Sequence, residues 1–327
     1  MNNSLLPSQN SETAISITDV VKYSEGWLLD CELKQHSAST LQNRELYISK
    51  LVWFLRHKEY TSCGVDELRS FFHHITSGHK DPQGRFGNPA LKKPVKAGTV
   101  AAYHRHIRAF FNWVVDEGRI ASSPMVRITP PVDRPDEVRP FTDAEVNSLI
   151  DAAKTTQNAK RDEAILWLLL DTGIRASELC ALRFQDMDMG AKTVIVQGKG
   201  GKSRSVPFGR TPAKVLWQYL KDEGREPDEP LFLSERGAAF TRLGLLQMIE
   251  RLGKKANLSS VRTSPHTFRH TFAVSFLRNG GNQFSLMSIL GHTSLEMTSR
   301  YVQFAQADVE RQHRQFSPAD NLKKGRK

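Results

Sequence analysis

The sequence predicts a mainly α-helical protein with a small antiparallel β-sheet (class α+β), divided into two domains. Apolar residues recur at helical spacing through most of the chain, whereas residues 193–206 alone have the signature of a β-hairpin. A proline-rich stretch separates two regions that are each long enough for a hydrophobic core. A length of 327 residues also fits about two domains.

The first domain is expected over residues 16–118 and is all helical. Four apolar stripes predict its helices: Thr18–His36, a helix that starts at Ser39 or Thr40, Val65–Ile75, and Thr99–Val115. Residues 1–15 are rich in Asn, Ser and Gln, which predicts a disordered N-terminus. The loop 78–98 contains prolines, glycines and four lysines, and its length predicts a functional or mobile segment.

A linker is expected over residues 119–136 because prolines recur there, and the second domain over residues 137–315. Thr142 and Glu145 make a capping box at its first helix. Further helices are expected at Glu163–Leu170 and from Ala176, Thr211, Thr241, His266, Gln283 and Ser294, with a short strand at Leu231–Leu233. Residues 316–327 form a basic tail.

The hairpin of the second domain has a basic, glycine-rich tip. Residues 193–196 and 203–206 flank the tip sequence Gly198-Lys199-Gly200-Gly201-Lys202. Glycines let the backbone approach a phosphate closely, and a lysine beside them can then reach it. A solvated lysine in a turn is the simpler interpretation when the segment is taken alone.

The charge balance indicates a polyanionic partner. A formal net charge of +11 accompanies an ordinary globular composition of 39% hydrophobic and 25% charged residues. Such a surplus favours nucleic acid, although a basic enzyme without that partner is the alternative.

The remaining composition predicts a cytoplasmic protein without a membrane or metal partner. Three separated cysteines, Cys31, Cys63 and Cys180, predict neither a disulfide framework nor a zinc site. No apolar run reaches the ~18 residues that a membrane span requires, and the polar start lacks a signal-peptide core.

Residues suited to phosphodiester chemistry follow one another in the second domain. Arg175 stands near a helix start, where a guanidinium and backbone amides can bind a phosphate, or it simply pairs with Glu178. His266 and Arg269 share one helical face, which alone fits an amphipathic surface helix equally well.

A histidine and a tyrosine complete this set. His292 follows a glycine, and Tyr301 follows nine residues later on an expected short helix. Each residue alone would be an ordinary structural side chain. Together with the arginines they supply a proton carrier and a nucleophile. His270, on a different helical face from Arg269, is expected to be structural.

Two strings make the chain resemble the tyrosine recombinases, also called the phage integrase family. Thr172-Gly173-Ile174-Arg175-Ala176-Ser177-Glu178-Leu179 resembles the first catalytic box of that family, and His266-Thr267-Phe268-Arg269-His270-Thr271-Phe272-Ala273 resembles the second. The resemblance covers about residues 137–315, and more weakly residues 16–118. Val302-Gln303 after the tyrosine departs from the threonine or histidine that many members carry.

The resemblance implies a mechanism in which Tyr301 attacks a DNA phosphate and forms a 3′-phosphotyrosine. The other implied roles are phosphate binding by Arg175, Arg269 and His292, a general base at His266, a general acid at Lys199 with Lys202 as the alternative, and support from Glu178. Neither a cofactor nor a metal is implied, because the covalent intermediate conserves the bond energy.

The implied partners are double-stranded DNA core sites, which a tetramer of this chain, alone or together with a paralogous recombinase, holds on two DNA segments. Residues 16–118 would be the helical, SAM-like core-binding domain and residues 137–315 the catalytic domain. The strands are exchanged through a Holliday junction. Integration, excision or transposition of a mobile element is the expected setting, and chromosome or plasmid dimer resolution is the alternative.

Two other functions compete with this hypothesis. A type IB topoisomerase shares the tyrosine nucleophile but relaxes DNA as a monomer. A catalytically silent DNA-binding accessory protein requires inactivity, although every catalytic residue type is present.

Overall fold

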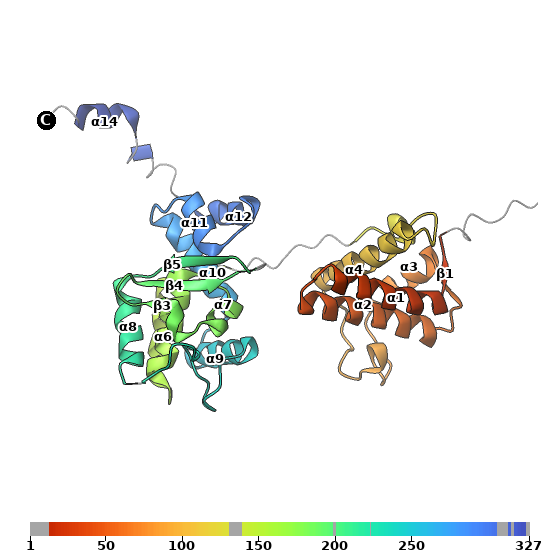
Figure 1. Ribbon diagram of the computed structural model, residues 1–327, viewed down its shortest axis with the longest axis horizontal. Coiled ribbons are helices and arrows are strands. Elements are labelled where there is room, and N and C mark those ends of the chain that lie inside the picture. The colour runs from red at the N-terminus through yellow and green to blue at the C-terminus, as the bar shows by residue number, and fades with distance from the viewer. Residues whose placement is uncertain are drawn as a thin grey trace, which may run out of the picture. The chain divides into compact units, whose positions relative to one another are not determined.

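The computed structural model describes residues 13–130, 139–198, 201–222, 224–305, 313–314 and 317–324. The chain forms two compact units, Met1–Asp136 and Glu137–Lys327 (Figure 1). Helices dominate both, and the strands form one two-stranded and one three-stranded antiparallel sheet, which confirms the predicted fold class. Within the described parts, no helix combines the length and the apolar character needed to cross a membrane.

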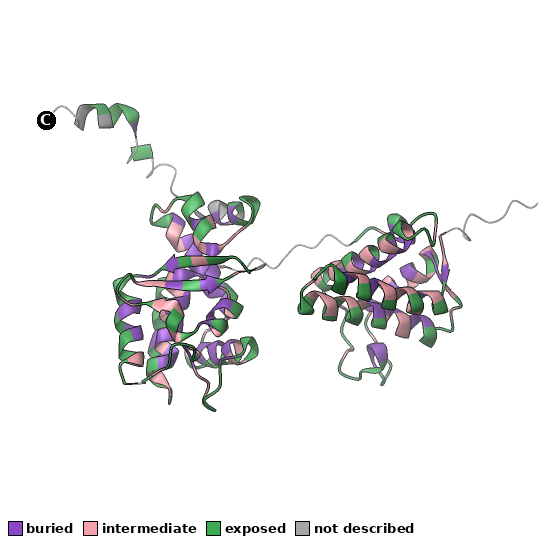
Figure 2. Cartoon of the chain, viewed as in Figure 1, coloured by how far each residue is buried: buried purple, intermediate pink, exposed green. Residues whose placement is uncertain are grey.

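Four helices make up most of the N-terminal unit: α1 (Ile17–Leu33), α2 (Ala38–His57), α3 (Val65–Thr76) and α4 (Ala97–Asp116). Each lies within a few residues of its expected range. Their apolar faces enclose an aromatic core that includes Trp27, Phe54, Phe71, Phe110 and Phe111. In Figure 2 these helices carry buried stretches that alternate with exposed ones.

The N-terminal strand β1 (Ile15–Ser16) is ordered, although Ile15 belongs to the stretch 1–15 that was expected to be disordered. Its partner is β2 (Ser62–Cys63), and buried Ile15 lies opposite Cys63. A strand of two residues has no sequence signature, because its pairing with β2 and the burial of Ile15 are both long-range contacts. Residues 1–12 lie outside the described residues.

The long loop between α3 and α4 is anchored in the core. Its 3₁₀ turn η1 (Arg85–Gly87) buries Arg85 and Phe86. The Arg85 guanidinium donates to the carbonyl oxygen of Lys93 at 2.8 Å, while Phe86 packs edge-on against Trp53. The four loop lysines are exposed. The loop is therefore built into the unit at one point and presents its basic side chains to solvent.

The expected linker over residues 119–136 is folded in its first part. The 3₁₀ helix η2 (Pro124–Arg127) places Met125 in the N-terminal core, and His104 Nε2 lies 2.7 Å from the carbonyl oxygen of Ile128. Prolines predicted extended chain here, but Pro124 and Met125 are buried and Ile128 is partly buried. Residues 131–136 lie outside the described residues.

Eight helices shape the described part of the C-terminal unit before residue 306: α5 (Asp143–Lys154), α6 (Ala159–Thr172), α7 (Ala176–Ala181), α8 (Arg210–Leu220), α9 (Arg242–Lys255), α10 (Pro265–Arg278), α11 (Gln283–Leu290) and α12 (Glu296–Ala305). Helix α6 is largely buried, because α5, α8 and α10 pack around it. The capping box of Thr142 and Glu145 is present at α5. Near the C-terminus, α14 (Pro318–Lys324) occupies part of the expected basic tail.

The sheet of the C-terminal unit contains the expected hairpin, β4 (Thr193–Gln197) and β5 (Ser203–Pro207), and one further strand, β3 (Met187–Asp188). The order is β3-β4-β5, and Gln197 pairs with Ser203, so that residues 198–202 form the tip. Residues 231–233, expected as a strand, take part only in an isolated bridge from Leu233 to Ala239. Their apolar pattern reflects burial of Leu231 and Phe232 in the core.

The packing of η2 predicts that substitutions at two neighbouring residues have different effects on stability. Met125 is 1% exposed and Val126 is 75% exposed. We expect Met125→Ala to lower the free energy of unfolding of the N-terminal unit by about 2 to 5 kcal/mol, because it leaves a cavity, and Val126→Ala to change it by less than about 0.5 kcal/mol. Denaturant unfolding measures both values. Equal effects would contradict the assignment of residues 119–130 to this unit.

Candidate active site

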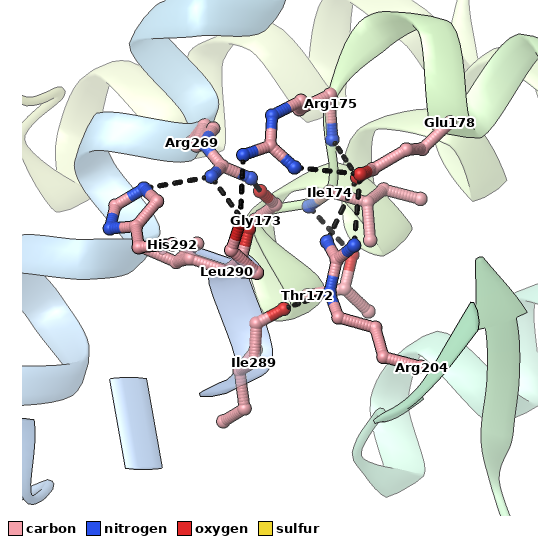
Figure 3. A network of polar contacts seen from close by, with 11 residues as sticks. Thr172, Gly173, Ile174, Arg175, Glu178, Arg204, Arg269, Ile289, Leu290 and His292 are labelled. Atoms are coloured by element: carbon pink, nitrogen blue, oxygen red, sulfur yellow. Dashed lines mark hydrogen bonds and ion pairs between the residues drawn. The ribbon is translucent and has the colours of Figure 1, made fainter. Parts of the chain in front are cut away.

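Helix α6 ends at Gly173, and the turn at this glycine positions Arg175, the first arginine of the site. Gly173 takes the left-handed conformation with φ of 59°. A Cβ atom there would also lie 2.3 Å from Cδ1 of Phe272, so the position excludes a side chain on two grounds. The tight turn brings Arg175 to the N-cap of α7 (Figure 3).

Arg175 is bound to Glu178 from both its backbone and its side chain. Its backbone N–H donates to Oε2 of Glu178 and its Nη1 to Oε1, each at 2.8 Å. Its Nη2 donates to the carbonyl oxygen of Gly291 at 3.1 Å. The side chain is still 39% exposed, so the guanidinium can meet an anion from solvent without losing these bonds.

Arg204 on β5 binds the other side of the same carboxylate. Its Nη1 and Nη2 donate to Oε1 and Oε2 of Glu178, both at 2.9 Å, and its Nε donates to the carbonyl oxygen of Ile289 at 2.7 Å. Burial would raise the pKa of Glu178, but the hydrogen bonds from Arg204 and then Arg175 lower it to about 2. Glu178 is therefore a buried carboxylate that stays ionised.

Arg269 on α10 is the most enclosed of the three arginines. Its Nη1 donates to the carbonyl oxygen of Gly173 at 2.7 Å and its Nη2 to that of Leu290 at 2.8 Å. Burial, followed by the charge of Arg175, lowers its pKa to about 10. The guanidinium remains protonated at neutral pH and is held beside the partly exposed Arg175.

His292 follows the left-handed C-cap Gly291 of α11 and is fixed through both ring nitrogens. Nη2 of Arg269 lies 2.9 Å from its Nε2, and Thr298 Oγ1 lies 2.9 Å from its Nδ1. Arginine can only donate, so Nε2 accepts and the proton of a neutral ring sits on Nδ1, which donates to Thr298. Thr298 is buried at the start of α12 and thus joins that helix to His292.

Tyr301 lies on α12 beside this histidine. The two rings are nearly parallel, with centroids 6.2 Å apart, and the ring of His270 is 5.3 Å away. Tyr301 is only 1% exposed and packs with apolar side chains of α10 and α11. The hydroxyl-bearing ring therefore adjoins the arginine cluster but is enclosed in this state.

His266 and the hairpin lysines complete the predicted set. His266 is exposed in the first turn of α10, which Ser264 caps, and precedes Arg269 by three residues. Lys199 lies outside the described residues, whereas Lys202 is exposed at the hairpin tip. The structure thus brings Arg175, Glu178, Arg269, His292 and Tyr301 together in one cluster, and places His266 on the helix that carries Arg269.

Sequence reasoning missed Arg204 and Thr298. Arg204 had a recoverable signal, because its alternation with Ser203, Ser205 and buried Val206 places it on the inward face of β5. Thr298 had no such sequence signal, since its role depends on the hydrogen bond with His292. Among the described residues, no group of three or more His, Cys, Asp or Glu side chains could hold a metal ion.

Comparison with known proteins assigns this arrangement to a family. The model described as the phage integrase family matches residues 139–308, more than half of the chain. Tyrosine recombinase XerD of Listeria innocua serovar 6a is 30% identical over 236 residues, which cover 70% of this chain and 79% of the relative. Tyrosine recombinase XerC of Bacillus subtilis (strain 168) is 31% identical over 224 residues, covering 66% and 73%.

Solved structures show the same fold. The Tn1549 transposon integrase in complex with transposon right end DNA superposes with a TM-score of 0.70 at 20% identity, covering 91% of this chain and 99% of that structure. A lambda integrase dimer bound to a COC′ core site gives a TM-score of 0.68 at 16% identity, covering 89% and 78%.

The pKa of Glu178 predicts how stability depends on pH. The pKa lies below the ordinary value of 4.5, so the ionised carboxylate stabilises the fold above that value and the contribution is lost as pH falls toward 2. We expect the difference in unfolding free energy between the native protein and Glu178→Gln to shrink by roughly 2 kcal/mol from about pH 6 to about pH 3. Denaturant titrations of both proteins measure this difference. The pH-dependent contributions of the other carboxylates are the same in both proteins and cancel. A constant difference would be incompatible with this account.

Proposed function

The chain belongs to the phage integrase family of tyrosine recombinases, and we propose that Tyr301 is the nucleophile with which it cleaves and rejoins DNA. One observation carries the assignment: Arg175, Arg269 and His292 converge on one point next to Tyr301, although they come from α7, α10 and the turn after α11. Phosphate ligands and a nucleophile in such proximity fit attack on a phosphodiester.

Arg175 and Arg269 would bind the non-bridging oxygens of the scissile phosphate. Their anchoring bonds to Gly291 and Leu290 use adjacent carbonyl oxygens, so the guanidinium groups are neighbours with a fixed orientation. Because these bonds exist before DNA arrives, little reorganisation is required when negative charge develops on the phosphate.

In the proposed reaction the Tyr301 oxygen forms a bond to phosphorus as the bond to the 5′-oxygen breaks. His266 would accept the tyrosine proton, and Lys199, or alternatively Lys202, would protonate the leaving 5′-oxygen. The products are a 3′-phosphotyrosine and a free 5′-hydroxyl. Attack by a 5′-hydroxyl of a partner strand reverses the step and joins the strands in a new arrangement.

His292 would donate a hydrogen bond from Nε2 to the phosphate. In the structure that nitrogen accepts a hydrogen bond from Nη2 of Arg269 instead. A phosphate near Arg269 offers its Nη2 another acceptor and favours a proton on Nε2, because the phosphate is negative. DNA binding would therefore convert His292 from an acceptor into a donor.

Tyr301 must also become accessible. A ring that is 1% exposed cannot reach a phosphate in solvent, so we expect α12 to shift when DNA binds. The bond from His292 to Thr298 gives that shift a physical link to the phosphate-binding side chains.

We infer that the partner is double-stranded DNA at core recombination sites. The net charge of +11 and the exposed lysines of the loop 78–98 support this, with the N-terminal unit as core-binding domain and the C-terminal unit as catalytic domain. Recombination needs four cleavages, which requires a tetramer on two DNA segments, formed by this chain alone or with a paralogous recombinase.

The proposed setting is integration, excision or transposition of a mobile element, and dimer resolution is the alternative. The basic loop 78–98 favours the first because it adds a charged surface to the N-terminal unit.

The nucleophile assignment predicts the behaviour of Tyr301→Phe. A nicked core-site substrate loses the short strand after cleavage and traps the covalent complex of the native protein. We expect Tyr301→Phe to form no such complex and to bind the site normally, because only the attacking oxygen is missing. Denaturing gels and mobility shifts measure the two properties. Covalent DNA on the variant would disprove the assignment.

The general acid can be identified by comparing Lys199→Ala with Lys202→Ala. The variant that lacks the acid should cleave about 10²- to 10⁴-fold more slowly. A substrate with sulfur in place of the leaving 5′-oxygen should restore that rate, because a thiolate leaves without a proton. The other lysine variant is the matched control. If sulfur restores neither variant, neither lysine is the acid.

A further inference from the structure

We propose that Arg204 is a positioning residue for strand cleavage, which fixes Arg175 through Glu178 and fixes His292 through the end of α11. This inference rests on the proposed function, because it concerns the orientation of the groups assigned to the phosphate. Arg204 is mostly buried, with 16% of its side chain exposed, and it binds protein groups through three of its N–H donors.

The first connection runs through the carboxylate of Glu178. Each of its oxygens accepts one bond from Arg204 and one from Arg175. Without Arg204, the partly exposed Arg175 would be the main cation left on a buried carboxylate and would be drawn toward both oxygens. Arg204 thus lets Arg175 bind Glu178 through one Nη atom and keep other donors for a phosphate.

The second connection runs through the end of α11. Three consecutive carbonyl oxygens there accept from three different arginines: Ile289 from Arg204, Leu290 from Arg269, and Gly291 from Arg175. The preceding carbonyls, of Met287 and Ser288, accept from the backbone N–H groups of His292 and Gly291. Arg204 therefore binds the carbonyl oxygen of Ile289, just before the turn that orients His292.

Gly291 shows how closely Arg204 fits this turn. A Cβ atom at residue 291 would lie 2.9 Å from Cζ and Nη1 of Arg204. The glycine therefore supplies the left-handed conformation and also the space that the guanidinium occupies. The strand and the turn are fitted to one another through this contact.

Arg204 also ties the hairpin to the arginine cluster. It lies on β5 directly after the tip that carries Lys199 and Lys202. Its bonds to Glu178 and Ile289 fix the base of the tip relative to Arg175 and His292. The same side chain would thus connect the strand that follows Lys202, the alternative general acid, to the phosphate ligands.

The test compares Arg204→Lys and Arg204→Gln with a matched arginine elsewhere. Arg161 is also buried, donates twice to the carboxylate of Asp162, and donates once to the carbonyl oxygen of Leu233. Arg161→Lys therefore removes a similar fork away from the proposed site. Covalent complex formation on nicked core-site DNA is measured in a single turnover and expressed per folded molecule.

We expect both Arg204 variants to cleave about 10- to 100-fold more slowly, because small displacements of reacting groups have effects of this size. Core-site binding should stay within about twofold, and Arg161→Lys should cleave normally. Cleavage by Arg204→Lys at the native rate, or equal slowing by Arg161→Lys, would overturn the inference. If the native protein itself formed no Tyr301-dependent complex, the proposed function would fail instead.

A pH profile separates positioning from a general loss of stability. In Arg204→Gln the carboxylate of Glu178 keeps only Arg175, with Arg269 nearby, so its pKa should rise. The cleavage rate of the variant, relative to that of the native protein at the same pH, should then decline toward acid pH, and adding Glu178→Gln should abolish that decline. An unchanged profile in Arg204→Gln would count against action through Glu178.

Discussion

The C-terminal end of α11 is the feature on which the site depends. A helix leaves its last carbonyl oxygens without helical partners and carries partial negative charge at that end. Here two of them accept from the turn backbone, and the next three accept from Arg204, Arg269 and Arg175. One helix end thus aligns guanidinium groups from a strand, a helix and a helix N-cap.

The carbonyl oxygens at this helix end help to hold three like charges close together. Three guanidinium groups in proximity repel one another, and the charge of Arg175 helps to lower the pKa of Arg269. Glu178 offsets part of the repulsion and the carbonyl dipoles offset more. The cluster of three arginines and one carboxylate still has a surplus of two positive charges. A phosphodiester can therefore bind to the arginines without first displacing the carboxylate of Glu178. Its negative charge then reduces the repulsion that remains between the guanidinium groups.

The sequence predicted what local chemistry determines. The helical stripes, the capping box at Thr142, the hairpin around its glycine-rich tip and the order of the arginine, histidine and tyrosine residues all follow from short patterns. The alternation of β5 marks Arg204 as inward-facing, but its role escaped because its partner Ile289 is 85 residues away. Residues 119–130 were assigned to a linker because their prolines are a local signal, whereas the burial of Met125 depends on packing against helices. Contacts between distant segments are what a local pattern cannot encode.

The hydrogen bonds of His292 connect the arginine cluster to the helix that buries Tyr301. Arg269, His292 and Thr298 form a chain of donors and acceptors that ends on α12, the helix that carries the tyrosine. Its first member would also bind the phosphate. A phosphate that takes the Nη2 donor of Arg269 removes the bond that keeps Nε2 of His292 as an acceptor. The ring stacked beside Tyr301 is then free to change its protonation and its tilt. Phosphate binding at the arginines would thereby weaken the contacts that enclose Tyr301, so that exposure of the proposed nucleophile would be coupled to the presence of its substrate.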